Sequence, residues 1–134
     1  MKLWSFFDFV DDRGENVIQR WLERDIAPSL TKRVRVKMTA YIQHLEVTAR
    51  FGRPYTADLH GECEGLLEII LNLGKVQYRP LACYGPDIAK EITLLMGARE
   101  RGGRFDPPGA CPTALGRRSL ILADRRYVVP HDFR

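Results

Sequence analysis

Residues 59–104 read LHGECEGLLEIILNLGKVQYRPLACYGPDIAKEITLLMGARERGGR, and this stretch decides the fold. It contains three apolar runs, at 66–71, 76–84 and 91–97, and short turns containing glycine separate them. Runs of this length that are rich in aliphatic residues are typical of strands, and short turns connect antiparallel neighbours. We therefore expect the three runs to form the centre of a small antiparallel sheet, with a bulge or an edge at Pro80.

The residues before this stretch predict one more strand and two helices. Residues 4–10 form an aromatic-rich run that ends at two aspartates, which is typical of a strand. Apolar residues then recur at helical spacing from Val17 to Ile26, and again from Leu30 to Thr48 after the interruption at Pro28. We expect Ser29 or Thr31 to cap the second helix, and the two helices to form a hairpin over one face of the sheet.

The residues after the stretch predict a loop, a helix and a tail. Paired glycines and paired prolines in 101–110 indicate a loop. A final helix should begin at Pro112 or Thr113 and run to about Asp124, followed by a tail from Tyr127. The predicted order is β-α-α-β-β-β-α, which describes one α+β domain over residues 1–134 with a small antiparallel sheet covered by a helical hairpin.

Composition is that of an ordinary globular protein. The chain has 134 residues, of which 45% are hydrophobic and 28% charged, and no apolar run is long enough to span a membrane. The start of the chain lacks the features of a signal peptide, so we expect a cytoplasmic protein with three reduced cysteines. His60 and Cys63 have no second close pair that would complete a zinc site, so we expect neither metal nor cofactor.

Positive charge is concentrated at the end of the chain. The net charge is +4, and residues 99–134 contain eight arginines and no lysine against four acidic residues, whereas residues 1–98 balance to zero. Guanidinium groups bind phosphate in a bidentate manner, which favours a polyanionic partner. Charge alone leaves open a solvated surface or an acidic protein partner.

Several segments together carry a resemblance to a known family. They are Leu59, Gly61, Gly65–Ile69, Gln77–Arg79, Leu94–Gly97, Arg99–Phe105, Pro107 and Arg125–Tyr127. In this pattern and in element order the chain resembles the RelE/ParE toxin superfamily, closest to its phage-derived, HigB-like branch. The resemblance implies a toxin of a type II toxin–antitoxin system, a metal-independent endoribonuclease that cleaves mRNA on the ribosome. It also implies a helix-turn-helix antitoxin as the partner.

The resemblance and the residue chemistry together nominate the site. Cleavage without metal needs cations for the phosphate and groups that move protons. We expect Arg79 to contact the scissile phosphate and Tyr127 and His131 to share the acid–base work. Phosphate binding along the flanking RNA is assigned to Arg99, Arg101, Arg104 and His60. Arg79 paired with Glu68 or Glu91, or Tyr127 packed on the sheet, would be structural alternatives.

One departure from the family pattern keeps the alternatives open. The family commonly has an arginine just after the LxEI strand motif, where this chain has Ile70. Losing a phosphate ligand favours a non-enzymatic protein of the same fold that binds a target such as gyrase, or an inactive phage-derived relative.

Overall fold

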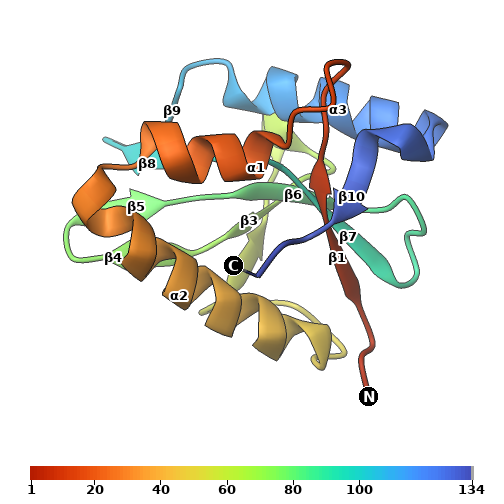
Figure 1. Cartoon of the computed structure of the whole chain (residues 1–134), viewed down its shortest axis with the longest axis horizontal. Helices are drawn as coiled ribbons and strands as arrows, with labels where there is room; N and C mark the ends of the chain where they lie inside the picture. Colours follow the sequence, from red (N-terminus) through yellow and green to blue (C-terminus); the bar gives the residue numbers. More distant parts are fainter. Residues whose placement is uncertain (134) are drawn as a thin grey trace.

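The computed structural model describes residues 1–133 and has an α+β fold (Figure 1). In chain order the elements are β1 (Ser5–Phe9), α1 (Val17–Arg20), η1 (Trp21–Asp25), α2 (Pro28–Glu46), β2 (Thr56–Asp58), η2 (Gly61–Cys63), β3 (Leu67–Ile69), β4 (Leu71–Leu73), β5 (Val76–Tyr78), β6 (Leu81–Tyr84), β7 (Glu91–Met96), β8 (Arg99–Arg101), β9 (Arg104–Asp106), α3 (Ala110–Ala123), η3 (Arg125–Tyr127) and β10 (Val128–Pro130). One sheet has the order β10-β1-β7-β6-β3-β2 and the other the order β4-β5-β8-β9.

The three predicted strands are present; the first two are each broken once, and the third is separated by a break from the unpredicted β8. The breaks lie at Ile70, at Arg79-Pro80 and at Gly97-Ala98. At each break the chain passes between the two sheets: β3, β6 and β7 belong to the first sheet, and β4, β5 and β8 belong to the second. Pro80 has no N–H and cannot donate to a ladder. Its carbonyl accepts from the Ile69 N–H, and the β6–β7 register shifts at the next residue pair. The irregularity expected at Pro80 is therefore confirmed.

The sheet is mixed, and the expectation of a purely antiparallel sheet was wrong. β1 pairs in parallel with β7, with Phe6 opposite Ile92 and Asp8 opposite Leu94. On its other side β1 pairs antiparallel with β10, which lies in the segment expected to be an irregular tail. These pairings join residues more than eighty positions apart, so no local pattern in the sequence indicates them.

The segment expected to be a loop, 101–110, contains a further strand. β8 and β9 form a hairpin in which Arg101 lies opposite Arg104. Gly102 and Gly103 connect them with φ values of 57° and 77°. Two consecutive positive φ values are what a two-residue hairpin turn requires, and glycine adopts them without strain.

The helices begin close to where the sequence places them. The side chain of Asn16 caps α1 by accepting from the backbone N–H groups of Ile18 and Gln19, both at 3.0 Å. α2 begins at Pro28 itself, since proline is well suited to the first helical position. Ser29 and Thr31 were therefore wrong as caps. Thr31 Oγ1 instead donates to the carbonyls of Leu22 and Ala27.

The helices lie on both sides of the first sheet. Figure 1 shows α2 and α3 with the strands between them. Alternation along β1 sends Phe6 and Asp8 to one face and Phe7 and Phe9 to the other. The guanidinium of Arg117, from α3, lies over the Phe9 ring, whereas Asn16 before α1 donates to Asp8. The buried apolar residues form one continuous cluster.

Two of the three cysteines are joined, which corrects the expectation that all are reduced. Cys63 in η2 and Cys111 in the first turn of α3 form a disulfide with a Cα–Cα distance of 5.1 Å. They lie 48 positions apart in the chain, so only folding brings them together. Cys83 is free and fully buried in β6, as expected of a small apolar residue within a strand. Within residues 1–133, no helix has both the length and the apolar character that crossing a bilayer requires.

Candidate functional site

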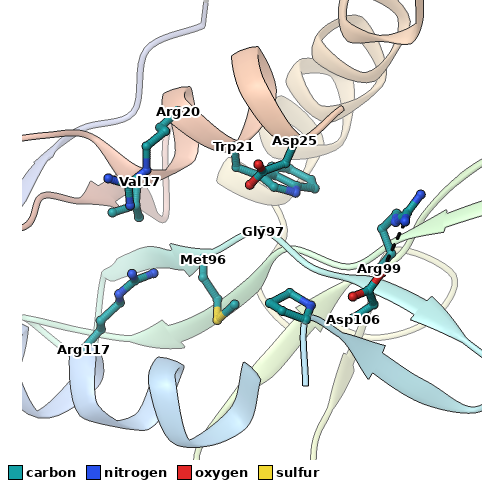
Figure 2. A pocket seen from close by; sticks show the side chains of 10 residues that line it. Val17, Arg20, Trp21, Asp25, Met96, Gly97, Arg99, Asp106 and Arg117 are labelled. Atoms are coloured by element: carbon teal, nitrogen blue, oxygen red, sulfur yellow. Dashed lines mark hydrogen bonds and ion pairs between the residues drawn. The ribbon is translucent and has the colours of Figure 1, made fainter. Parts of the chain in front are cut away.

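A cleft opens where β1 stops short of the end of β7. The parallel pairing ends at Asp8 and Leu94, although β7 continues to Met96. The space beside the uncovered end of β7 is bordered by α1 and η1 on one side and by α3 on the other (Figure 2). Its volume is about 400 Å³. The polar side chains that line it are Arg20, Asp25, Arg99, Asp106 and Arg117.

The floor of the cleft depends on a glycine. A Cβ built on Gly97 would lie 1.8 Å from Cδ2 of Trp21, so the indole rests directly on the strand backbone. The ring also meets Tyr78 edge-on, with centroids 6.0 Å apart. This packing holds η1, which carries Asp25, against the break between β7 and β8.

Among residues 1–133, Arg117 has no carboxylate within ion-pairing distance. Its Nη1 donates to the Leu95 carbonyl at 2.9 Å, and its guanidinium lies 5.1 Å from the centre of the Phe9 ring. Among residues 1–133 no acidic side chain forms an ion pair with it. Burial lowers the pKa of this guanidinium, and the positive charge of Arg20 lowers it further, while the more distant carboxylate of Asp11 partly offsets both. A half-buried cation that faces another cation is well placed to bind an anion.

The other two arginines of the cleft are paired at its rim. Arg20 Nη1 lies 2.9 Å from Glu15 Oε2 and 3.5 Å from Asp11 Oδ2. Arg99 Nη2 lies 3.2 Å from Asp106 Oδ2, the pair joined by the dashed line in Figure 2. These pairs are partly exposed and therefore screened by water, so both guanidinium groups can also bind a stronger anion.

Arg79, nominated as the phosphate contact, lies outside this cleft and is held by the protein. Its side chain shares a face with Gln77, as expected, and is buried. Its Nη1 donates to Asn72 Oδ1 at 2.9 Å and to the Tyr78 carbonyl at 2.8 Å. Two carboxylates flank it, Glu100 at 3.3 Å and Glu68 at 3.9 Å. The pairing with Glu68 that the sequence left as an alternative is therefore present.

Tyr127 and His131 are placed apart from the cleft lining, and each has partners. Tyr127 Oη lies 2.9 Å from Asp12 Oδ1, to which it donates, and its ring stacks on Phe9 with centroids 5.9 Å apart. His131 is buried, with Nδ1 2.7 Å from Oδ1 of the fully buried Asp8. The imidazole therefore helps to attach β10 to β1 through a buried polar contact.

Three of the four residues nominated for phosphate binding line one of two separate hollows, and Arg101 lines neither. Arg99 lines the cleft, and Arg101 is exposed beside it with Nη1 3.6 Å from Asp106 Oδ2. Arg104 and His60 line a separate hollow of about 590 Å³ next to the Cys63–Cys111 disulfide. Of the seven nominated residues, the structure places only Arg99 in the lining of the cleft.

Four polar residues of the cleft were missed by sequence reasoning, namely Arg20, Asp25, Asp106 and Arg117. Arg117 belongs to the arginine-rich end of the chain, which is the one signal that pointed toward it. Arg20 and Asp25 lie beside the apolar stripe of the first helix, where charged residues are ordinary. Only the meeting of α1, η1 and α3 at the end of β7 distinguishes them.

Neither a metal centre nor a known relative identifies the cleft. Residues 1–133 contain no group of three or more histidine, cysteine, aspartate or glutamate side chains arranged to hold a metal ion. No family model, curated protein or solved structure matches the chain. The resemblance to the RelE/ParE superfamily therefore stays a prediction, and the cleft must be interpreted from its own chemistry.

Proposed function

We propose that this protein is a RelE-like toxin that binds the ribose–phosphate backbone of mRNA in the cleft between α1 and α3 and cleaves it on the ribosome. The observation that carries the proposal is Arg117, a half-buried guanidinium with no carboxylate within ion-pairing distance among the described residues. Burying a cation without an anion is unfavourable, and a bound phosphate would remove that cost.

The composition of the cleft favours a nucleic-acid backbone over other anions. Arg20, Arg99 and Arg117 come from three separate elements and line one space of about 400 Å³. Small-ligand sites have volumes in the range of roughly 300–1,000 Å³, and a space at the lower end suits one segment of a single strand rather than a duplex. Arginine forks bind the two free oxygens of a phosphodiester and stabilise the extra charge of a pentavalent transition state.

A non-enzymatic toxin-fold protein is the second candidate, and one observation favours it. Among residues 1–133, no imidazole or phenol lines the cleft, because Tyr127 and His131 are engaged with Asp12 and Asp8 elsewhere. Ile70 also stands where the family pattern has arginine. In that case the arginine cleft would bind an acidic surface of a protein target such as gyrase, or belong to an inactive phage-derived relative.

Expression in bacteria with mapping of new mRNA 5′ ends tests the first candidate against the second. The informative variant is Arg117→Gln, and the matched control is Arg50→Gln. Arg50 is exposed and adjoins Phe51, whose ring contacts Trp4 just before the start of β1, whereas the cleft lies beyond the end of β1. The control substitution therefore removes the same charge at a site far from the cleft. We expect new ends in translated regions with the native chain and the control, and their loss in Arg117→Gln.

The outcomes separate the candidates. Growth arrest without new 5′ ends would refute the ribonuclease and leave the protein-binding toxin. Cleavage that survives Arg117→Gln would refute the cleft as the site. The proposed antitoxin, a small helix-turn-helix protein, should suppress both arrest and cleavage when expressed together with the toxin.

A further inference from the structure

We propose that Asp25 is the general base of the cleft and removes the proton from the 2′-hydroxyl of the bound RNA. This inference rests on the proposed ribonuclease function and assigns its proton acceptor. Asp25 ends η1 and lines the cleft beside Trp21, on the wall opposite Arg117 (Figure 2).

The carboxylate of Asp25 is exposed and has no partner in the part of the chain that the structure describes. No hydrogen bond or ion pair of its side chain occurs within residues 1–133. The other carboxylate of the lining, Asp106, already lies between two cations, with Arg99 at 3.2 Å and Arg101 at 3.6 Å. Because Asp25 is exposed, its carboxylate is the one in the lining for which only solvent competes with a ligand among the described residues.

An exposed carboxylate beside a phosphate-binding cleft can exchange its water for a hydrogen-bond donor of the ligand, but it does not attract every part of RNA. It repels the phosphate that the arginines attract, so it weakens binding of the backbone as such. Ionised aspartate only accepts hydrogen bonds, and RNA offers a 2′-hydroxyl donor next to every phosphodiester, which DNA lacks. Asp25 can therefore interact favourably with the 2′-hydroxyl of RNA, and this hydroxyl is the nucleophile in metal-independent RNA cleavage.

The other candidate base in the lining is Asp106, which is paired with Arg99 and Arg101. The lining within the described chain contains arginines, two aspartates and apolar residues, and neither Tyr127 nor His131 belongs to it. Arginine stays protonated and cannot accept the proton. Trp21, wedged on Gly97, anchors the turn that presents Asp25, so the carboxylate projects from a packed element rather than from a loop.

The step balances without a cofactor. The 2′-O–H proton passes to the Asp25 carboxylate as the 2′-oxygen bonds to phosphorus, and the bond from phosphorus to the 5′-oxygen breaks. Arg99 and Arg117 stabilise the charge on the phosphoryl oxygens. The departing 5′-oxygen takes a proton from water, and Asp25 returns its proton to solvent. The products are a 2′,3′-cyclic phosphate and a 5′-hydroxyl.

The test compares Asp25→Asn, Asp25→Glu and the control Asp58→Asn in a purified translation mixture with a defined mRNA. Asp58 is exposed on β2, at the far edge of the first sheet, and matches the charge change. Cleavage rate, product ends and RNA retention on a filter are measured, together with an mRNA carrying a 2′-deoxynucleotide at the cut. We expect Asp25→Asn to slow cleavage by about 100-fold or more while RNA binding is kept or tightened.

Further outcomes decide the inference. Partial recovery in Asp25→Glu and an uncut 2′-deoxy substrate would support it. Cleavage by Asp25→Asn at the native rate, or a loss of binding that accounts for its slower rate, would overturn the role of Asp25 and leave the ribonuclease intact. Absence of cleavage by the native protein would overturn both.

Discussion

Opening the Cys63–Cys111 disulfide should lower the thermal stability of this protein by a predictable amount. The bond joins η2 to the first turn of α3, the helix that presents Arg117 to the cleft. It closes a loop of 48 residues, and the chain-entropy relation assigns to such a loop a stabilisation of about 4 kcal/mol at 25 °C. Unfolding entropy of about 2.1 cal/mol/K per residue, over the whole chain, converts this to a fall in Tm of roughly 14 °C.

Thermal unfolding followed by circular dichroism, with and without reductant, measures this fall. The native protein should lose stability when reduced, whereas Cys63→Ala should have the same low Tm in both conditions. Cys83→Ala is the matched control, because Cys83 is buried and free. We expect a somewhat lower Tm from its small cavity, but the full sensitivity to reductant.

Counting thiols checks the same bond by chemistry. The unreduced protein in denaturant should expose one thiol, that of Cys83, and three after reduction. In the native state Cys83 should resist alkylation at pH 8, since burial raises its pKa to about 12. Three thiols before reduction, with a Tm indifferent to reductant, would refute the disulfide and the stabilisation derived from it.

Two further substitutions examine packing and charge. Gly97→Ala places a Cβ 1.8 Å from the Trp21 ring and should cost about 1–3 kcal/mol in urea unfolding. In Gly116→Ala, in α3, the added Cβ meets nothing within 4 Å, so this substitution should stabilise the protein by about 0.5–1 kcal/mol. If both substitutions changed the free energy of unfolding equally, the packing of the Trp21 indole on Gly97 would be contradicted. Hydrogen bonds from Arg125 lower the pKa of Glu91, so its stabilisation is present above the ordinary pKa of a glutamate and is lost as the pH falls through the lowered folded value. Glu91→Gln should therefore be less stable than native protein at neutral pH, with a gap that closes in acid; a gap that persists there would show that charge is not its source.

Local chemistry was sufficient to predict most of the elements. Apolar runs and glycine turns located the three central strands, and the irregularity at Pro80 follows from its missing N–H. Helical periodicity located the two N-terminal helices, because burial of one face imposes that spacing wherever a helix packs on a sheet. These features depend on residues a few positions apart, so the sequence expresses them directly.

The candidate site was predicted less well, and Arg79 shows why. Alternation along its strand correctly placed it on the face of Gln77, but that face also carries Glu68 and Glu100, which engage the guanidinium. The register between neighbouring strands decides which face of the sheet carries their acidic side chains. A residue type suited to phosphate binding is therefore no guide to whether the protein leaves it free.

By itself the sequence determined an α+β chain with a β-meander at its centre, two helices before it and an arginine-rich end after it. The tertiary structure alone decided that β1 runs parallel to β7 and that Cys63 meets Cys111. It also decided that Asp25 and Arg117 face each other across one cleft. Each of these joins segments at least 48 positions apart, and such contacts are selected by the burial and pairing of the whole fold rather than by any local pattern.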